Sequence, residues 1–282
     1  MSSGPQLPTP TWFVGCGNMG GAIIDGWRIA EVDLAPITVI RPSGKPIEGV
    51  RAVTRFAEAG APPKLLVLAF KPQKLDEIAP QLRNWTTSKT VVLSLLAGVE
   101  GASLKQRFPN AGTIVRVTTN LPVAIRRGVS ALYSEDASDS TKQQIGDLFA
   151  ALGFAMWAKD EARLATIGSV AGAGPAYIAR FVAALAKAGE DRGLSRDIAA
   201  TIALETVLGT AWMATMRRED MASVAKRVAS PNGTTEAGLA VLDHEQALDS
   251  LIAETIEAAA RRGAELAEAA KSPSLAEPAR LH

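Results

Sequence analysis

Short apolar runs alternate with helical patterns through the first half of the chain. The apolar runs lie at 11–14, 37–40, 65–70, 91–96 and 113–117, and helical spacing covers 19–29, 74–84 and 101–107. The run at 65–70 is apolar at nearly every position, which is typical of a strand buried on both faces of a parallel sheet. Strands and helices alternating at this spacing predict an α/β fold with a doubly wound parallel sheet. A strand over 129–133 and a helix over 138–151 extend the pattern.

The second half has almost no strand pattern and predicts helices alone. The expected helices cover 161–192, 196–217, 220–228, 234–243 and 245–270. Residues 176–188 and 201–213 are apolar on most sides, and helices of that kind must be buried. Burial against a second copy of the chain predicts an all-α dimerisation domain and a homodimer, or a higher oligomer built from dimers. Packing against the first domain alone is the alternative.

The length and these patterns together predict two domains. A chain of 282 residues corresponds to about two domains. We expect an α/β domain over 1–158, with a loose tail at 1–10, and a helical domain over 159–271. A frayed tail is expected over 272–282.

Composition and charge narrow the possible functions. The formal net charge of +1 provides no overall field for a polyanion, so we expect no nucleic-acid partner. No uninterrupted apolar run reaches the ~18 residues of a membrane span, and the start of the chain lacks the regions of a signal peptide. We therefore expect a cytoplasmic protein without a membrane partner. A single cysteine and two histidines argue against disulfides, metal sites and histidine-dependent hydrolases.

A glycine-rich loop follows the first expected strand and opens the first helix. It reads Gly15-Cys16-Gly17-Asn18-Met19-Gly20. In this context the three glycines permit a tight turn, a close approach to a pyrophosphate, and contact between helix and strand. The loop therefore predicts a Rossmann-type dinucleotide site at Gly15, Gly17, Asn18, Met19 and Gly20. An ordinary glycine-rich turn is the alternative, and Cys16 is interpreted as a small filler of the cleft.

The second expected strand indicates which dinucleotide is bound. An NAD site usually has an acidic residue here that binds the ribose 2′-hydroxyl. This strand instead ends in Arg41-Pro42-Ser43-Gly44-Lys45. Arg41 and Ser43 could bind a 2′-phosphate, so we expect NADPH, with NADH possible. Lys45 has the character of a solvated loop residue.

Three further loops follow strands of the expected sheet. In doubly wound sheets, ligands lie beyond the carboxyl ends of the strands. We therefore assign to the cofactor site Lys71 and Pro72, Ala97 and Gly98, and Asn120. A surface position for Lys71 is an equally good interpretation.

Two loops of the helical half also contain candidate chemistry. Gly172-Ala173-Gly174-Pro175-Ala176-Tyr177 precedes an apolar helix, and packing is sufficient to explain its glycines. The stretch Ser230 to Gly238 places three hydroxyl groups and free amides at the start of a helix. Such a start can bind a small carboxylate. Simple capping by Thr234 or Thr235 explains the same residues.

Taken together, these motifs resemble the pyrroline-5-carboxylate reductase family along nearly all of residues 11–270. The glycine loop, Phe70 to Gln73 and Ser94 to Val99 are similar to the nucleotide-binding half of that family. Gly172 to Tyr177 is similar to its Gly-Ser-Gly-Pro-Ala-Tyr segment, and Val228 to Leu242 to its signature loop. The resemblance implies a Rossmann domain, a helical domain that interleaves with a second subunit, and reduction of 1-pyrroline-5-carboxylate to L-proline with NAD(P)H. It also implies that Thr235 hydrogen-bonds the ring nitrogen, and that Ser230, Gly233 and Thr234 hold the substrate carboxylate.

Several positions depart from that family pattern. The usual Arg-x-Met-Pro-Asn-x-Pro is Arg116-Val117-Thr118-Thr119-Asn120-Leu121-Pro122 here. Ala173 replaces a serine, and Asn232 replaces a glycine; asparagine tolerates a left-handed backbone. These departures leave a non-catalytic dinucleotide-binding regulator as one alternative, and a β-hydroxyacid dehydrogenase, which shares the two-domain plan, is the other. The dehydrogenases place a catalytic lysine one turn into the long helix, where this chain has Tyr177-Ile178-Ala179-Arg180.

Overall fold

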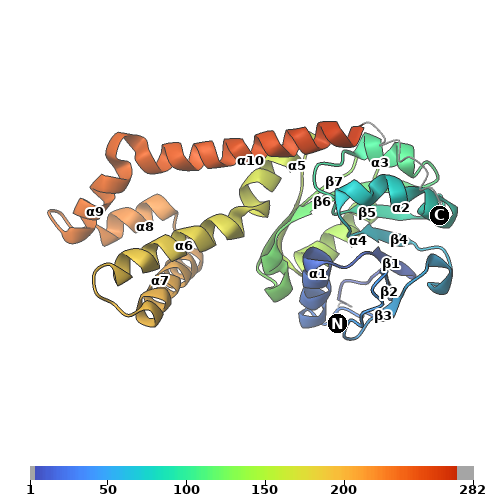
Figure 1. The fold of residues 1–282 in the computed structure, drawn as a ribbon, viewed down its shortest axis with the longest axis horizontal. Coiled ribbons are helices and arrows are strands. Elements are labelled where there is room, and N and C mark those ends of the chain that lie inside the picture. The colour runs from blue at the N-terminus through green and yellow to red at the C-terminus, as the bar shows by residue number, and fades with distance from the viewer. Residues whose placement is uncertain (1–3, 272–282) are drawn as a thin grey trace, which may run out of the picture. The chain divides into compact units, whose positions relative to one another are not determined.

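The structure, a computed structural model, describes residues 4–271 and contains two compact units (Figure 1). Unit 1 comprises the chain up to Ala173 together with the segment that begins at Ala259, and unit 2 comprises Gly174–Ala258. These units differ from the expected division at 158–159, which stays a prediction about folding domains. The frayed tail expected over 272–282 lies outside the described residues.

Unit 1 is built on an eight-stranded sheet with the order β3-β2-β1-β4-β5-β6-β7-β8. Its strands are β1 (Thr11–Val14), β2 (Ile37–Ile40), β3 (Arg51–Val53), β4 (Leu65–Leu68), β5 (Val91–Ser94), β6 (Thr113–Thr119), β7 (Gly128–Tyr133) and β8 (Gly153–Trp157). All neighbours are parallel except β6 and β7. Only a short 3₁₀ turn, η4 (Leu121–Ile125), joins these two strands. A parallel pair needs a longer crossover, so β7 returns antiparallel.

Helices cover both faces of this sheet (Figure 1). They are α1 (Asn18–Ile29), α2 (Leu75–Leu82), α3 (Gly101–Arg107), α4 (Asp139–Ala150) and α5 (Glu161–Ile167), with 3₁₀ turns η1 (Phe56–Glu58), η2 (Pro72–Lys74) and η3 (Arg83–Trp85). α1 and α4 share one buried cluster, in which the Trp27 indole N–H donates to the carbonyl of Leu148 at 2.8 Å. α2 and α3 contribute to the other cluster. The doubly wound α/β fold expected from the sequence is confirmed.

The expected loose tail at 1–10 is anchored from Leu7 onward. Leu7 is buried in the same cluster as α1 and α4. The carbonyl of Pro10 accepts the amide of Lys64 at 2.8 Å, and the Thr11 hydroxyl donates to the carbonyl of Pro8. The bond between Lys64 and Pro10 extends the pairing of β1 with β4, so the segment from Leu7 to Pro10 belongs to the packed unit.

A π-helical turn, η5 (Gly168–Gly172), follows α5 and leads into the helices of unit 2. These are α6 (Gly174–Glu190), α7 (Arg196–Arg217), α8 (Met221–Val228), α9 (Thr234–Asp243) and α10 (Ala247–Lys271), with the 3₁₀ turn η6 (His244–Gln246) before α10. α10 begins in unit 2 and ends in unit 1. The bounds of α7 and α9 agree with the expected helices.

Unit 2 has a very small core of its own. Its buried cluster consists of Ala186, Ala199 and Ala203, where α6 meets α7. Larger apolar side chains of the same two helices remain exposed in the single chain, among them Ile178, Phe181, Leu185, Ile202, Leu208 and Trp212. Three alanine side chains contribute only a few kcal/mol of burial, at about 0.8 kcal/mol per CH₂-sized group. The apolar faces of α6 and α7 therefore lack the cover that a stable fold requires.

Candidate functional site

The nucleotide-site residues expected from the sequence follow strands whose carboxyl ends share one edge of the sheet. The register pairs Val14 with both Ile40 and Leu68, and pairs Leu68 with Ser94. The loops that begin at Gly15, Arg41 and Ala69 therefore start side by side, and the third of them leads to Lys71. Those that contain Ala97 and Asn120 follow at the ends of β5 and β6. Ligands of such sheets bind at this edge.

The geometry of the glycine loop explains each of its glycines. Gly15 has a φ of +76°, and a Cβ added there would lie 2.7 Å from the carbonyl oxygen of Ala69. A Cβ on Gly20 would lie 3.3 Å from the Ala69 Cβ, so α1 depends on this glycine to pack closely against the end of β4. Nothing lies within 4 Å of a Cβ on Gly17, which leaves open space above the loop.

The start of α1 is suited to a phosphate group. Gly17 is the N-cap, no side chain caps the helix, and the first turn contains no acidic residue. Asn18, Met19 and Gly20 begin α1, where backbone N–H groups have no partner within the helix. These amides and the positive end of the helix dipole fit a pyrophosphate.

Arg41 lies next to the glycine loop. Its guanidinium Nη1 donates to the carbonyl of Cys16 at 3.3 Å, and its Nε donates to the carbonyl of Lys45 at 3.0 Å. The amide of Lys45 lies 3.5 Å from the Ser43 hydroxyl, within the same exposed turn. Arg41 and Ser43 thus lie at the end of β2, where the adenosine ribose binds in a dinucleotide site of this type.

Cys16 is held in a state of low reactivity. Burial raises the pKa of the Cys16 thiol, although the nearby Arg41 guanidinium opposes that rise. A raised pKa leaves less thiolate at any given pH, and the thiolate is the nucleophile. The structure therefore favours the interpretation of Cys16 as a filler of the cleft.

We expect iodoacetamide to alkylate Cys16 more slowly than a free cysteine at pH 8, because less of the thiol is ionised. The pH profile of the alkylation rate should have its midpoint above the ~8.5 of an unperturbed thiol. A Cys16→Ser variant supplies the background rate, since this chain has no other cysteine. A midpoint below 8 would contradict the burial effect.

The expected cofactor residues in the loops after β4 and β5 differ in exposure and packing. The side chains of Lys71 and Ala97 are exposed, and Pro72 is half-buried. Gly98 has a φ of +75°, and a Cβ added to it would lie 2.8 Å from the Cβ of Leu266 in α10. Gly98 therefore allows the last turns of α10 to cross the loop closely, a role that no local sequence signal indicates. Lys71, Pro72, Ala97 and Gly98 stay predicted cofactor contacts.

Both polar atoms of the Asn120 side chain form hydrogen bonds within unit 1. Its Nδ2 donates to the carbonyl of Ala171 at 3.0 Å, and its Oδ1 accepts the amide of Val129 at 2.9 Å. Asn120 is 6% exposed, so little of its amide faces solvent. Its expected contact with the cofactor stays a prediction, and the structure adds a structural role that the sequence did not indicate.

The expected substrate loop in unit 2 is a tight turn between α8 and α9. The amide of Gly233 donates to the carbonyl of Ser230 at 3.0 Å, and a Cβ on Gly233 would lie 2.4 Å from the Ser230 hydroxyl oxygen. Asn232 has a φ of +59°. The departure from glycine at this position is therefore accommodated, because asparagine tolerates the left-handed region. Glycine at 233 is favoured because a Cβ there would also lie 2.9 Å from the backbone carbonyl oxygen of Ser230, which cannot rotate away as the hydroxyl can.

The first turn of α9 leaves its polar groups available. Gly233 is the N-cap and no side chain caps the helix. Among the described residues, the hydroxyls of Thr234 and Thr235 have no hydrogen-bond partner, which argues against simple capping. The carboxylate of Glu236 accepts the amide of Asn232 at 2.7 Å, and the amide of Gly233 is engaged with Ser230. The amides of Thr234 and Thr235 are thus better placed than that of Gly233 to bind a carboxylate.

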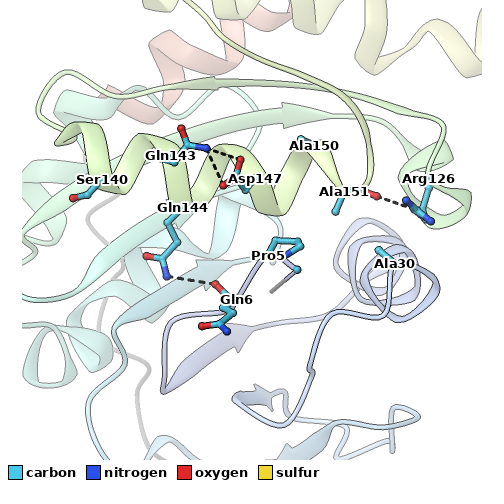
Figure 2. A pocket seen from close by; sticks show the side chains of 11 residues that line it. Pro5, Gln6, Ala30, Arg126, Ser140, Gln143, Gln144, Asp147, Ala150 and Ala151 are labelled. Atoms are coloured by element: carbon cyan, nitrogen blue, oxygen red, sulfur yellow. Dashed lines mark hydrogen bonds between the residues drawn. The ribbon is translucent and has the colours of Figure 1, made fainter. Parts of the chain in front are cut away.

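A separate surface pocket of about 840 Å³ lies between the N-terminal segment and α4 (Figure 2). Its lining includes Gln6, Gln144 and Arg126, and none of the expected site residues. It also includes Ala30, which caps the end of α1 opposite the glycine loop. The pocket is therefore distinct from the nucleotide edge. Residues 4–271 contain no group of three or more His, Cys, Asp or Glu side chains that could hold a metal ion.

Comparisons with known proteins bear on both units. Residues 161–266 match the family model described as "Pyrroline-5-carboxylate reductase dimerisation". A pyrroline-5-carboxylate reductase of Pseudomonas aeruginosa is 35% identical over 263 residues, which are 91% of this chain and 96% of that protein. A pyrroline-5-carboxylate reductase of Synechocystis is also 35% identical, over 90% of this chain and 97% of its own length.

Solved structures agree with this sequence relationship. The structure of a pyrroline-5-carboxylate reductase from Coxiella burnetii has a TM-score of 0.82 and 28% identity, over 92% of this chain and 99% of that chain. A pyrroline carboxylate reductase from Plasmodium falciparum, solved with NADP bound, has a TM-score of 0.83. At 23% identity, over 92% of this chain and 98% of that chain, the latter supports the fold alone.

Proposed function

The chain belongs to the pyrroline-5-carboxylate reductase family, and from that premise we propose that it reduces 1-pyrroline-5-carboxylate to L-proline, the last step of proline biosynthesis. The observation that carries the proposal is similarity at 35% identity along 91% of the chain. The loop between α8 and α9 lies within the matched region 161–266. The chain is accordingly an oxidoreductase that acts on a C–N bond.

The arrangement of polar groups suits the reduction of an imine. Reduction of a ketone creates an alkoxide that a proton donor must neutralise, whereas a protonated cyclic imine loses its positive charge when it accepts hydride. The protein then has chiefly to bind and orient the substrate. We propose that the Thr235 hydroxyl hydrogen-bonds the ring nitrogen, and that the Ser230 hydroxyl and the amide of Thr234 hold the carboxylate. Gly233 contributes by making room for Ser230.

The sheet edge of unit 1 fits an NADPH cofactor, which supplies the hydride when bound. The open space at Gly17 and the uncapped start of α1 suit the pyrophosphate. We propose that Arg41 and Ser43 recognise the 2′-phosphate, and that Lys71, Pro72 and Ala97 line the nicotinamide half. We also propose a cytoplasmic location, since substrate and cofactor are small and soluble.

A homodimer accounts for the apolar faces of unit 2. Two helical stretches of the described chain, Glu161–Glu190 and Arg196–Arg217, are long and apolar enough to cross a membrane by length and composition alone. Both stretches reach this level only on average, because polar residues, glycines and charged residues interrupt them, so the expectation about uninterrupted apolar runs holds. Both stretches overlap the matched dimerisation region, 161–266, so a second copy is the partner that we propose for these faces.

Light scattering on the purified protein at micromolar concentration should show a dimer or a multiple of it. Phe181 is 48% exposed in the single chain. Phe181→Glu should therefore dissociate the assembly, because it would bury a charge in the apolar interface. Phe181→Leu keeps the apolar character and should leave the assembly intact. A stable, well-folded wild-type monomer would rule out the obligate dimer.

A direct turnover assay tests the proposed activity. Purified protein is mixed with NADPH and pyrroline-5-carboxylate, and loss of the nicotinamide absorbance is followed. Turnover supports the reductase, whereas tight NADPH binding without turnover would indicate the non-catalytic regulator. In a second assay, the protein is mixed with NADP⁺ and small β-hydroxyacids, and a rise in absorbance without any imine reduction in the first assay would indicate the dehydrogenase.

A further inference from the structure

The second half of β6 contacts α5 and the π-helical turn η5, which together form the connector that leads to unit 2. Arg116, Thr118 and Asn120 alternate along β6 and the residue that follows it, so their side chains share a face. Arg116 pairs with Glu161 at the start of α5, with Nη1 and Oε1 2.9 Å apart. The Thr118 hydroxyl oxygen lies 3.1 Å from the position of a Cβ on Gly168. Asn120 donates to the carbonyl of Ala171.

Asn120 donates to a carbonyl that has lost its usual helical donor. In an α-helix, the carbonyl of Ala171 would accept the amide of the residue four positions later. That residue is Pro175, which has no N–H. The chain here forms the π-helical turn Gly168–Gly172, and such turns bend helices and occur often at functional positions. The Asn120 Nδ2 thus supplies a donor to the carbonyl that Pro175 cannot serve.

The Asn120 side-chain oxygen is also hydrogen-bonded, and this bond fixes the orientation of the side chain. Its Oδ1 accepts the amide of Val129 at the start of β7. Both ends of the amide are therefore engaged across β6, β7 and the π-helical turn, with the side chain buried. An exposed ligand-binding amide would present at least one end to the open edge of the sheet.

From this geometry we propose that Asn120 is a positioning residue. It replaces the hydrogen bond that Pro175 cannot make to Ala171, and so fixes the turn from which α6 begins. Its effect on catalysis rests on the proposed reductase function. Hydride transfer depends on alignment of the reacting groups, and small displacements can cost large factors in rate. A loosened turn changes the start of α6 and lowers kcat without removing any contact to the nucleotide.

A double-mutant cycle tests this assignment. Pro175→Ala restores a backbone N–H opposite the Ala171 carbonyl, so it should compensate for the loss of the Asn120 donor. Asn120→Ala alone should lower kcat by about tenfold, with a change of less than about twofold in the Kd for NADPH. Asn120→Asp keeps an acceptor for Val129 and removes the donor, so it should show a similar loss. Adding Pro175→Ala to Asn120→Ala should recover most of the lost kcat.

Hydrogen exchange gives a readout that does not depend on turnover. Amides between Gly168 and Gly174 should exchange faster in Asn120→Ala and return toward the wild-type rate in the double variant. A rise in the Kd for NADPH as large as the fall in kcat, or no recovery with Pro175→Ala, would overturn the proposal in favour of a cofactor contact. Lowered Tm with unchanged kcat would reduce Asn120 to a purely structural residue. Wild-type protein without reductase activity would defeat the proposed function, while exchange would still decide whether Asn120 holds the turn.

Discussion

Thr235→Val is expected to lower kcat/KM for pyrroline-5-carboxylate by about ten- to hundredfold. Valine keeps the shape of threonine and removes only the hydroxyl. A hydrogen bond to a charged group contributes about 1.5–3 kcal/mol, which corresponds to this loss in rate. The affinity for NADPH should barely change, because Thr235 is in unit 2 and the glycine loop is in unit 1. Steady-state kinetics and a binding titration on the same preparation measure both quantities.

Two control variants separate the role of Thr235 from its surroundings. Thr235→Ser retains a hydroxyl and should keep most of the activity. Ser230→Ala should raise KM more than it lowers kcat, because we assign Ser230 to the substrate carboxylate.

The competing explanation for Thr235 is that it only caps α9. Loss of a cap costs about 1 kcal/mol of stability and leaves the chemistry intact. In the structure Gly233 is the N-cap and receives no side-chain hydrogen bond, which already favours a role outside the helix. If Thr235→Val lowers Tm while kcat/KM per folded enzyme is unchanged, the proposed bond to the ring nitrogen is wrong. The family membership would still hold.

The parallel core of unit 1 was predictable because its buried strands consist of consecutive apolar residues. β4 is Leu65-Leu66-Val67-Leu68, buried throughout, and its short length between Pro63 and Pro72 favours a strand over a buried helix segment. β3 and β8 were not predicted, since both lie at the edges of the sheet. Arg51 is exposed in β3, and Phe154 and Met156 are exposed in β8. Edge strands lack the continuous apolar signal that marks a buried strand.

The position of the nucleotide site, at the carboxyl ends of the strands, was predictable from the sequence. The contacts of several of its residues were not. Gly15 and Gly20 meet Ala69, which lies just beyond the adjacent strand, so strand order alone anticipates the close approach. Gly98 and Asn120 instead meet Leu266 and Ala171, which are remote in sequence. A glycine or an asparagine after a strand has the same local appearance whether it faces a ligand or its own chain. Only the tertiary structure distinguishes these possibilities.

For the apolar helices of unit 2, the need for burial was predictable, but the surface that buries them was not. The sequence correctly indicates that α6 and α7 need burial, and the exposed Phe181, Ile202 and Trp212 show that the single chain does not supply it. Periodicity identifies the apolar face but not its partner. The match of 161–266 to the dimerisation family supplies that information.

Arg41→Ala is expected to weaken NADPH binding by about ten- to hundredfold and to leave NADH affinity within about threefold. Only NADPH carries the 2′-phosphate, and a charge-assisted bond to it contributes about 1.5–3 kcal/mol. Arg41 also donates to the carbonyls of Cys16 and Lys45. Its loss can therefore loosen the glycine loop and weaken both cofactors, so the ratio of the two Kd values is the decisive quantity.

Two neighbouring substitutions make that ratio interpretable. Arg41→Lys keeps the charge but loses the planar guanidinium, so it should retain part of the preference for NADPH. Lys45→Ala removes a charge from the same exposed turn, and on our assignment it should change the ratio little. Titration of each variant with both cofactors at one fixed ionic strength gives the ratios, since surface charge effects are screened by salt. Equal losses for NADPH and NADH in Arg41→Ala would show that Arg41 only supports the loop, and would remove the basis for expecting NADPH as the preferred cofactor.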